Sequence, residues 1–568
     1  GEILNYLILA CDYDGTLAKD GRVSEETFRS LRRLHDSGIK LILVTGREME
    51  ELKTVFNHFE IFEKIVAENG ALIYDHHSRE TKLLGTPPPP EFIDSAKRNG
   101  INKYSVGKVI FATWKPFEKI VLETIRDLGL ELQVIFNKDA VMVLPPGVNK
   151  AAGLKEALKI LEYSAHNVIG IGDAENDHAF LELCELSAAV KNALPMLKES
   201  VDYVTKADHG DGVSELIEII LKDNFTDFKK RIKKSSILFG WDENKNEINL
   251  PISDNSILIT GSSGGGKTTM ATAILEQLAE KQYQFCLIDP EGDYAEFKNA
   301  VPVGLSSPPK IESIQKVLQN PEQNCIVNLT NISLDDRPAF FQKLFPSLVR
   351  LRSTFGRPHF VILDETHHLL PESSIPINLK SDELKQFLFN AVKPAHVAKL
   401  ILSSVSIVLS LGEEADKFLK DYFKSIGEEV PEFPEGKYES LIWRRDKNKI
   451  FTIAETVSPK IKLKRHIKKY SEGDVGDGNS FVFSGPKGKL NLKAQNVIYF
   501  IRIAEGIDDE TWSFHLKKNE YSGWFKKIIK DEDLADEIKE IEDDKNFSPD
   551  ESKELIINKI KNIYTATV

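Results

Sequence analysis

Short apolar runs alternate with longer amphipathic segments along most of this sequence. The apolar runs have the length of buried strands and lie at residues 7–12, 41–46, 167–172, 256–261, 285–290, 359–365 and 400–406. The segments between them place apolar residues at helical spacing. A regular succession of strand and helix is typical of parallel sheets whose faces are covered by helices. The pattern therefore predicts an α/β fold for residues 1 to about 425.

Three irregular segments divide this pattern into separate units. Four consecutive prolines at 87–90 open an insertion, and a charged run at 225–234 separates two complete α/β units. An acidic stretch with two prolines, at 427–438, precedes a segment that ends in charged helices. We expect a Rossmann-like domain at 1–222 with a small α+β cap at about 80–148, a second α/β domain at 235–430, and a mainly helical module at 431–568.

Composition narrows the class of protein. Hydrophobic residues make up 41% and charged residues 28% of the 568 residues, which excludes a disordered or collagen-like chain. No apolar run reaches the roughly 18 residues needed to span a bilayer, so we expect no membrane partner. The first residues lack the pattern of a secretory signal, and the four cysteines are scattered without metal-ligand spacing. We expect a cytoplasmic protein with reduced thiols.

Acidic residues gather at the ends of two predicted strands in the first domain. Asp12 and Asp14 leave the first strand, and Asp173 and Asp177 follow the strand at 167–172. The carboxyl ends of parallel strands form one edge of the sheet, where α/β proteins build their sites. Several carboxylates at one edge repel one another unless a divalent cation joins them, and their oxygen atoms suit Mg²⁺. The sequence therefore predicts a magnesium site at this edge.

Four short motifs appear in order in this domain. They are DYDGT at 12–16, the threonine of LVTGR, the lysine of GVNK and GDAEND at 172–177. In this order they resemble the haloacid dehalogenase (HAD) superfamily of phosphatases, and the insertion resembles the short cap of phosphoglycolate and sucrose-phosphate phosphatases. The resemblance covers residues 1 to about 222 and implies hydrolysis of a phosphate monoester. A cap closed over the site favours a small phosphorylated metabolite as substrate.

The resemblance also implies a role for each motif residue. Asp12 would attack phosphorus and carry an aspartyl-phosphate, while Asp14 would protonate the leaving oxygen and then activate water. Thr45 and Lys150 would hold the phosphoryl oxygens. The implied metal-site residues are Asp12, Asp14 through its carbonyl, Asp173 and Asp177, the last acting with Asn176 to orient the set.

A glycine-rich turn joins the strand at 256–261 to the helix that follows. The run GSSGGGKTT at 261–269 fits the pattern G-x-x-x-x-G-K-T. The glycines let main-chain N–H groups meet the β-phosphate, while Lys267 reaches the β and γ oxygens and Thr268 can bind Mg²⁺. The predicted ATP-binding residues are Gly261, Gly264, Gly265, Gly266, Lys267, Thr268 and Thr269.

An adjacent acid pair follows the apolar strand of HFVILDE. Asp364 would hold the shell of Mg²⁺ and Glu365 would activate water against the γ-phosphate. The pair of histidines just beyond, His367 and His368, is interpreted as surface or interface rather than as metal ligands. With IDPEGDY at 288–294, these features resemble the HerA/FtsK group of motor ATPases over residues 235 to about 425.

That second resemblance implies further features. The group usually works as a homo-oligomeric ring in which a neighbouring subunit donates an arginine, and the candidates are Arg350, Arg352 and Arg357. It places Asp289, Glu291 and Asp293 near the nucleotide. It also assigns Ser403 or Ser404 as the polar sensor, on a strand predicted at 400–406.

We interpret the chain as a Mg²⁺-dependent phosphatase fused to an ATP-hydrolysing domain that regulates or assembles it. A nucleic-acid end-processing phosphatase and kinase would join the same two kinds of domain, but the cap, the net charge of −13 and the acid pair argue against it. An ATP-gated oligomeric scaffold or defence component is a further alternative. The basic run at 460–470 is interpreted as a solvated face or domain contact, and no role is predicted for the C-terminal module.

Overall fold

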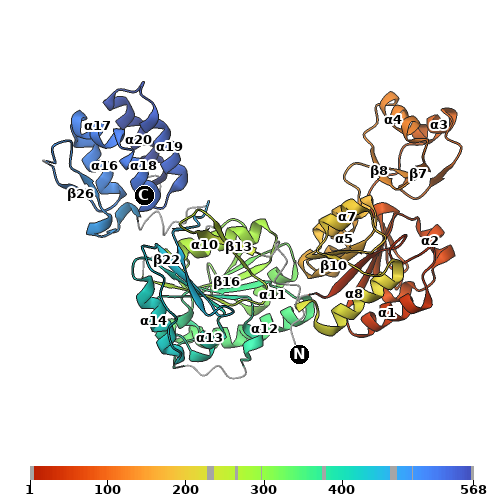
Figure 1. The fold of residues 1–568 in the computed structure, drawn as a ribbon, viewed down its shortest axis with the longest axis horizontal. Coiled ribbons are helices and arrows are strands. Elements are labelled where there is room, and N and C mark those ends of the chain that lie inside the picture. Colours follow the sequence, from red (N-terminus) through yellow and green to blue (C-terminus); the bar gives the residue numbers. More distant parts are fainter. Residues whose placement is uncertain are drawn as a thin grey trace.

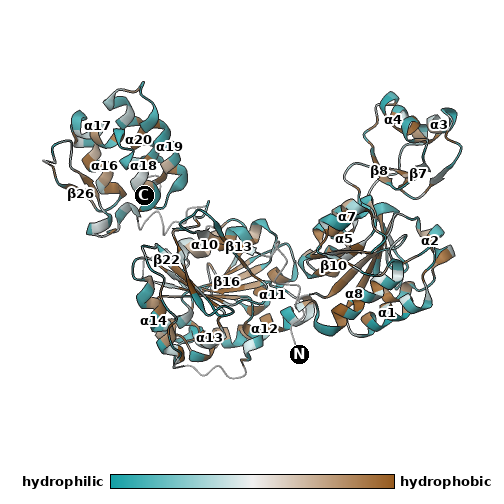
Figure 2. Cartoon of the chain, in the orientation of Figure 1, coloured by the Kyte–Doolittle hydropathy of each residue, from teal (hydrophilic) through white to brown (hydrophobic). Residues whose placement is uncertain are grey.

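A computed structural model describes residues 6–226, 236–262, 266–295, 297–373, 379–460, 470–488 and 490–564. Gly264 and Gly265 of the predicted phosphate-binding loop lie outside the described residues, as do most of the charged run at 225–234 and most of the basic run at 460–470. Two α/β domains lie side by side, a cap projects from the first, and a helical module lies beyond the second (Figure 1). Apolar residues are concentrated in the central sheets (Figure 2).

The first domain is built on an eight-stranded sheet. Its order in space is β12 (Tyr203–Val204), β11 (Leu186–Ala189), β10 (Val168–Gly172), β1 (Ile8–Asp12), β2 (Lys40–Val44), β3 (Phe62–Ala67), β4 (Leu72–Tyr74) and β5 (Thr81–Leu83). The first six are parallel, β4 pairs antiparallel with β3, and β5 pairs antiparallel with β4. Every residue of β1 and β10 is buried, as the continuous apolar runs predict.

Helices cover the faces of this sheet. They are α1 (Glu25–Asp36), α2 (Met49–Val55), α5 (Lys150–Leu161), α6 (His178–Leu183), α7 (Pro195–Ser200) and α8 (His209–Asp223). The start of α5 is fixed by Asn149, whose side chain accepts a hydrogen bond from the main-chain N–H of Ala152. This helix-capping hydrogen bond places Lys150 at the first position of α5.

The cap is a separate α+β layer, as predicted. Its antiparallel sheet has the order β6 (Tyr104–Val106), β7 (Phe111–Trp114), β9 (Ala140–Leu144) and β8 (Gln133–Asn137), and it carries α3 (Pro90–Arg98) and α4 (Glu118–Asp127). Phe92, Phe111 and Val121 lie in a small hydrophobic core of its own.

The second domain contains a nine-stranded sheet. The order is β17 (Val301–Val303), β18 (Cys325–Asn328), β16 (Phe285–Asp289), β19 (Phe360–Leu363), β20 (Phe387–Ala391), β15 (Ile257–Gly261), β21 (Ile407–Leu411), β22 (Ser440–Arg444) and β23 (Lys449–Ile453). Its helices are α10 (Lys267–Glu280), α11 (Ile311–Gln319), α12 (Arg337–Phe355), α13 (Lys399–Ser404) and α14 (Ala415–Ile426). A small sheet of β14 (Glu247–Pro251), β13 (Ser236–Trp241) and β24 (Glu455–Thr456) packs beside it.

Two predictions for this domain are wrong. Strands β22 and β23 pair with β21, so the domain extends past the predicted boundary at 430. The acidic stretch at 427–438 is thus a loop inside the domain. Helix α14 ends before it, at the left-handed residue Gly427, and the two prolines follow within the loop. The strand predicted at 400–406 is mostly helix α13, and the strand of this apolar run is β21.

The C-terminal module is mainly helical, as predicted. It comprises β25 (Phe481–Phe483), β26 (Leu492–Ala494), α16 (Val497–Gly506), α17 (Asp509–Lys517), α18 (Glu520–Lys527), α19 (Glu532–Asp543) and α20 (Pro549–Tyr564). Trp512, Trp524 and Phe525 are buried in its core, so these aromatic residues pack the module and do not form an exposed stacking surface.

The two α/β domains meet through the amino-terminal ends of their parallel strands. Asn167, just before β10, lies with its Oδ1 2.9 Å from Nε2 of His359, just before β19. Tyr283, just before β16, donates a hydrogen bond to Glu185, just before β11, at 2.8 Å. The carboxyl ends of both sheets therefore point away from this interface.

Two further observations concern the cysteines and the helices. All four cysteines are buried thiols outside disulfide bonds. Among the described residues, no helix combines the length and the apolar character that crossing a bilayer requires.

Candidate active sites

The carboxyl edge of the first sheet holds a buried lysine between two aspartates. Nζ of Lys150 lies 2.8 Å from Oδ1 of Asp12 and 2.7 Å from Oδ1 of Asp177. All three side chains are at most 6% exposed. Burial and the charge of Asp177 raise the pKa of Asp12, while Lys150 opposes this shift. Burial alone would lower the pKa of Lys150, but the two carboxylates raise it, so the lysine stays charged.

Asp173 completes a cluster of three buried carboxylates. Asp12, Asp173 and Asp177 each offer an oxygen, and these oxygens lie within 4.8 Å of one another. Thr16 donates a hydrogen bond either to Asp12 at 3.0 Å or to Asp173 at 3.3 Å. Buried carboxylates this close repel one another, and hard oxygen donors of this kind fit a divalent cation such as Mg²⁺. The sequence motif contained Thr16, but its place between the two acids is visible only in the structure.

Asp177 organises the loop that carries Asp173. Its Oδ2 accepts hydrogen bonds from the main-chain N–H groups of Asp173 and Ala174, at 2.9 and 3.1 Å. Gly172 must lack a side chain because a Cβ atom there would collide with Asp177. Asn176 donates to Asn69 of the η2 turn (Glu68–Gly70) at 3.0 Å.

Asp14 faces a different partner from the other motif acids. Arg47 forms a bidentate pair with it, from Nε at 2.6 Å and from Nη2 at 2.9 Å. This pairing raises the pKa of Arg47. Thr45 is buried at the end of β2, and its hydroxyl accepts the main-chain N–H of Arg47 at 3.1 Å. Asp12 pairs in register with Val44, so Thr45 lies one residue beyond the level of Asp12 on the neighbouring strand.

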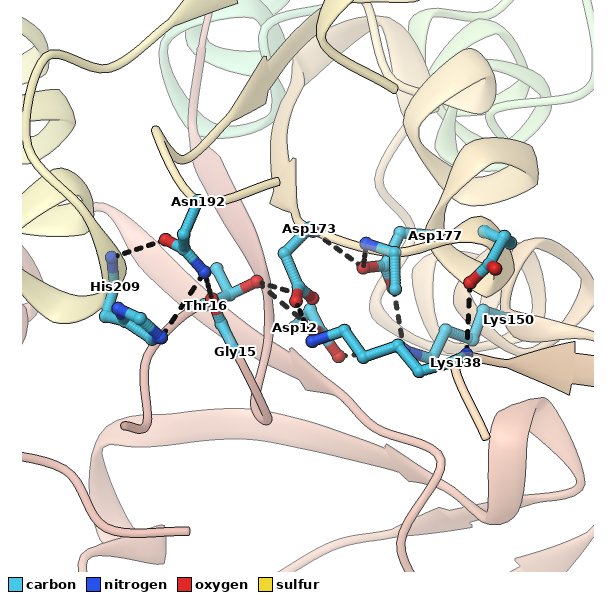
Figure 3. Close-up of polar contacts among 11 residues, drawn as sticks. Asp12, Gly15, Thr16, Lys138, Lys150, Asp173, Asp177, Asn192 and His209 are labelled. Carbon is cyan, nitrogen blue, oxygen red and sulfur yellow. Dashed lines mark hydrogen bonds and ion pairs between the residues drawn. The ribbon is translucent and has the colours of Figure 1, made fainter. Parts of the chain in front are cut away.

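Residues outside the four motifs also shape the site (Figure 3). Asn192 donates to the carbonyl of Gly15 at 2.8 Å, and the main-chain N–H of His209 donates to Asn192 at 2.8 Å. Gly15 has φ +78°, and a Cβ atom there would collide with the carboxylate of Asp173. From the cap, Lys138 reaches Asp173, with Nζ 2.8 Å from Oδ2. No motif pointed to Lys138, Asn192 or His209.

A buried glutamate connects the cap to the first domain. Glu68 is 1% exposed, and its carboxylate accepts hydrogen bonds from the main-chain N–H groups of Lys108 and Val109, at 2.6 and 3.1 Å. Burial raises the pKa of Glu68, and the two N–H groups oppose the shift. The cap loop is therefore held at a defined position beside the site.

The second site lies at the carboxyl edge of the second sheet. Gly266 has φ +95° and precedes α10, and Lys267 is the first residue of that helix. The Lys267 ammonium donates to the carbonyls of Gly261 and Ser262, at 3.2 and 2.9 Å. Strand, turn and helix thus stand in the order that a phosphate-binding loop requires, with Thr268 and Thr269 on the first turn of α10.

Asp364 and Glu365 follow β19 at the same edge. Asp364 is 1% exposed, and Glu365 adopts a left-handed conformation with φ +45°. Non-glycine residues in this conformation are strained and are often functional. His367 lies beside Glu365, with Nε2 3.6 Å from Oε2, and burial lowers the pKa of His367 to about 4. His367 is thus neutral near pH 7.

Asn390 is a buried polar residue near the carboxyl end of β20. It lies between the strand of Asp364 and the strand of the phosphate-binding loop. Asn390 is 2% exposed, and its Oδ1 is buried without a hydrogen-bond partner. Ser403 and Ser404, the predicted sensor residues, lie on helix α13 and not on the strand predicted for them. In the sequence, Asn390 is the one polar residue of the run FLFNA at 387–391, and this interruption is the signal that could have pointed to it.

The three arginines considered as donors to a neighbouring subunit differ in how deeply their side chains are buried. Arg352 donates to the carbonyls of Pro358 and Lys385, at 3.0 and 2.6 Å, and burial lowers its pKa to about 9. Arg357 is fully buried and donates to the carbonyl of Glu162 in the first domain at 2.6 Å. Neither side chain is placed to reach another subunit, whereas Arg350 is exposed.

Asp289 serves mainly to shape its own loop. It accepts main-chain hydrogen bonds from Gly292, Asp293 and Tyr294, at 3.0, 3.1 and 3.0 Å. Burial raises its pKa to about 6, and these N–H groups oppose the shift. The turn after β16 is thereby fixed next to the nucleotide-binding edge.

Two family models match this chain. The chain matches the family of haloacid dehalogenase-like hydrolases at residues 9–98 and 86–217, and the central domain of the helicase HerA at 244–350. It is 34% identical over 219 residues to a phosphoglycolate phosphatase of Methanothermobacter thermautotrophicus, covering 37% of this chain and 96% of that protein. It is 29% identical over 232 residues to phosphoglycolate phosphatase 2 of Saccharolobus solfataricus, covering 39% of this chain and 95% of that protein.

A further relative and a solved structure cover the same part of the chain. A 5-amino-6-(5-phospho-D-ribitylamino)uracil phosphatase of Bacillus subtilis is 28% identical over 240 residues, covering 38% of this chain and 96% of that protein. The crystal structure of a haloacid dehalogenase-like hydrolase from Bacteroides thetaiotaomicron has 21% identity and a TM-score of 0.33, covering 38% of this chain and 99% of that chain. By its first domain the chain belongs to the haloacid dehalogenase-like hydrolases, and this phosphatase domain is fused to a P-loop ATPase domain of the HerA type.

Proposed function

We propose that the first domain hydrolyses a small phosphate monoester with the help of Mg²⁺. The observation that carries the proposal is the buried cluster of Asp12, Lys150, Asp173 and Asp177 at the carboxyl edge of the sheet, beneath the cap. Asp12, the carbonyl of Asp14 and Asp173 would hold the cation, with Asp177 orienting them. When bound, Mg²⁺ supplies positive charge that offsets the charge of the phosphoryl group.

The chain's own residues account for the transfer. An Asp12 oxygen attacks phosphorus, the bond from phosphorus to the ester oxygen breaks, and Asp14 gives a proton to the leaving oxygen. Water then attacks the aspartyl-phosphate, Asp14 takes its proton, and phosphate leaves Asp12. Lys150 keeps Asp12 in place and, with Thr45, stabilises the phosphoryl oxygens. Because Arg47 pairs with both oxygens of Asp14, the Asp14 side chain must leave Arg47 and carry a proton before it can protonate the leaving oxygen.

The names of the relatives guide the choice of substrate. Two are phosphoglycolate phosphatases and one acts on a phosphorylated ribitylaminouracil, and each is covered almost completely by the first domain. We therefore place the substrate among small phosphorylated metabolites, with 2-phosphoglycolate as the first compound to test.

For the second domain we propose ATP binding and hydrolysis that regulates or assembles the phosphatase. Gly261, Gly266, Lys267, Thr268 and Thr269 would bind the phosphates, with Gly264 and Gly265 of the same loop. Asp364 would hold the Mg²⁺ that accompanies ATP, and Glu365 would activate water. In a homo-oligomer, Arg350 is the candidate to reach a neighbour's nucleotide.

The phosphatase proposal is tested on the full chain with Asp12→Asn. We expect Mg²⁺-dependent phosphate release from 2-phosphoglycolate or another small ester, abolished by EDTA and reduced by about a thousandfold or more in Asp12→Asn. Asp20→Asn makes the same change at an exposed position and should not reduce release. Metal-dependent hydrolysis that survives in Asp12→Asn would contradict the proposed nucleophile.

The ATPase proposal is tested with Glu365→Gln. This change should stop ATP hydrolysis and leave ATP binding intact, because the amide cannot accept the proton of water. Glu372→Gln, at an exposed position on the same loop, is the matched control. Measuring phosphatase rate and mass in solution with and without ATP then shows whether nucleotide regulates or assembles the first domain; no change in either quantity contradicts that part of the proposal.

A further inference from the structure

The cap places one positive charge at the mouth of the phosphatase site. Lys138 lies between strands β8 and β9, at the tip of the hairpin that they form, and adopts φ +55°. Its main-chain N–H donates to Glu175 at 3.2 Å, and its Nζ lies 2.8 Å from Oδ2 of Asp173 (Figure 3). The hairpin tip is thus docked on the loop that carries the metal-site acids.

Lys138 differs from the other cation of the site in its burial. The Lys138 side chain is 52% exposed, whereas Asp173 is 1% exposed and Lys150 is 1% exposed. Lys150 is fixed between two carboxylates, but about half of the Lys138 side chain is open to solvent. Its ammonium can therefore turn from Asp173 to another anion beside the site.

The remaining charges of the site are already paired. Lys150 forms ion pairs with Asp12 and Asp177, and Arg47 forms one with Asp14. Asp173 accepts a hydrogen bond from Lys138, and it is also a ligand of the divalent cation proposed above. A cation bound there would compete with the ammonium and leave Lys138 free for the substrate.

Other cap lysines do not share this position. Lys103 lies over the ring of Trp114, 4.8 Å from its centre, and Lys119 on α4 is 84% exposed near Glu123. Among the lysines from α3 to β9, in the part of the chain that the structure describes, Lys138 alone forms a side-chain hydrogen bond to an acid of the first domain.

We propose that Lys138 binds a second anionic group of the substrate, a carboxylate carried a few bonds from the phosphate ester. This inference rests on the proposed phosphatase function and defines its substrate class. The phosphoryl group lies at Asp12, on the core side, where Thr45 and Lys150 are placed to hold it. An ammonium contributed from the cap faces the part of the substrate that differs between one ester and another. Lys138 is therefore the specificity residue for short phosphorylated carboxylic acids.

The test compares two esters of nearly equal length. One is 2-phosphoglycolate and the other is 2-hydroxyethyl phosphate, in which a neutral hydroxymethyl group replaces the carboxylate. We expect Lys138→Gln to lower kcat/KM for 2-phosphoglycolate by about tenfold or more, as loss of a charge-assisted hydrogen bond implies, and to change kcat/KM for 2-hydroxyethyl phosphate less than about threefold. Lys119→Gln removes the same charge from the outer helix of the cap and should leave both values unchanged.

A binding measurement separates recognition from chemistry. In the Asp12→Asn background, Lys138→Gln should weaken binding of 2-phosphoglycolate by a similar factor and leave binding of 2-hydroxyethyl phosphate unaltered. An equal loss for both esters, or no loss for either, overturns the assignment of Lys138 while the phosphatase function stands. Absence of phosphate release from any small ester by the unmodified chain overturns the proposed function itself, and the assignment of Lys138 with it.

Discussion

The hydroxyl of Tyr283 in the ATPase domain lies 2.8 Å from Oε1 and 2.9 Å from Oε2 of Glu185 in the phosphatase domain. Glu185 is 5% exposed, and Nδ1 of His166 lies 2.5 Å from its Oε2. The interface between the domains therefore encloses a carboxylate whose partners come from both sides. Such a group is costly to leave without a donor.

Tyr283→Phe should loosen this interface. Loss of the hydroxyl deprives a buried carboxylate of one donor, at a cost of about 1–3 kcal/mol. We expect faster amide hydrogen exchange at residues 163–167 and 281–284 in the variant. Tyr203→Phe is a matched control, because Tyr203 donates to Glu215 at 2.7 Å within the phosphatase domain. Exchange that is unchanged at both segments in Tyr283→Phe would show that the contact does not hold the domains together.

Lys150→Met should destabilise the phosphatase domain as well as inactivate it. The change leaves Asp12 and Asp177 buried without their shared counter-charge, and breaking a buried ion pair in this way costs about 3–5 kcal/mol. Adding Asp177→Asn to Lys150→Met removes one of the two orphaned charges. We expect the double variant to regain part of the free energy of unfolding in urea but none of the phosphate release. A double variant less stable than Lys150→Met alone would argue against the charge explanation.

Asn390→Ala should slow ATP hydrolysis by about a hundredfold and leave ATP affinity within a few-fold. Its amide lies between the strands that carry Asp364 and the phosphate-binding loop, where a fixed dipole can act on the transferred phosphoryl group. Ser404→Ala should have no effect, because Ser404 lies on α13 and donates to the carbonyl of Ile401. Steady-state hydrolysis and nucleotide titration measure the two quantities, and the reverse pattern in the two variants would restore the serine assignment.

Glu542 should make the stability of the C-terminal module depend on pH. Burial raises its pKa from 4.5 to about 7, and the main-chain N–H of Ser522 opposes the shift. The folded module thus binds this proton more tightly than the unfolded chain, so the contribution is complete below about pH 4.5 and is lost as pH rises through about 7.

The check is hydrogen exchange in α18 and α19 between about pH 5 and 8, corrected for the intrinsic dependence of exchange on pH. Protection should fall with rising pH in the unmodified chain and change less in Glu542→Gln. Glu540→Gln, at an exposed position of the same helix, should behave like the unmodified chain. Equal pH dependence in Glu542→Gln and the unmodified chain would contradict the assignment.

The sequence motifs located the residues that end strands, because a strand end is a local property. Asp12, Asp173 and Asp364 each follow an apolar run, and the parallel order of the strands brings such ends to one edge. Lys138 could not be found in this way. It lies 35 residues before Asp173 in the chain, and only the docking of the cap brings the two together.

The errors in the second domain have a different origin. Residues 400–411 form one long apolar run, and such a run does not reveal where a helix ends and a strand begins. The serines at its centre end α13, and the strand follows. Likewise, the prolines at 431 and 434 indicate a loop, but a loop within a domain and a linker between domains have similar composition. Pairing of β22 with β21 is a long-range contact that composition does not record.

The carboxyl edges of the two sheets point away from the domain interface, and this orientation limits how the two sites can influence one another. The two sites lie away from the interface, which is made of the beginnings of strands and the ends of helices. A product of one proposed reaction would therefore reach the other site only through solvent. The proposed regulation by ATP would have to cross the interface as a displacement of these strand beginnings, and it would change how the phosphatase domain is held and not what reaches Asp12.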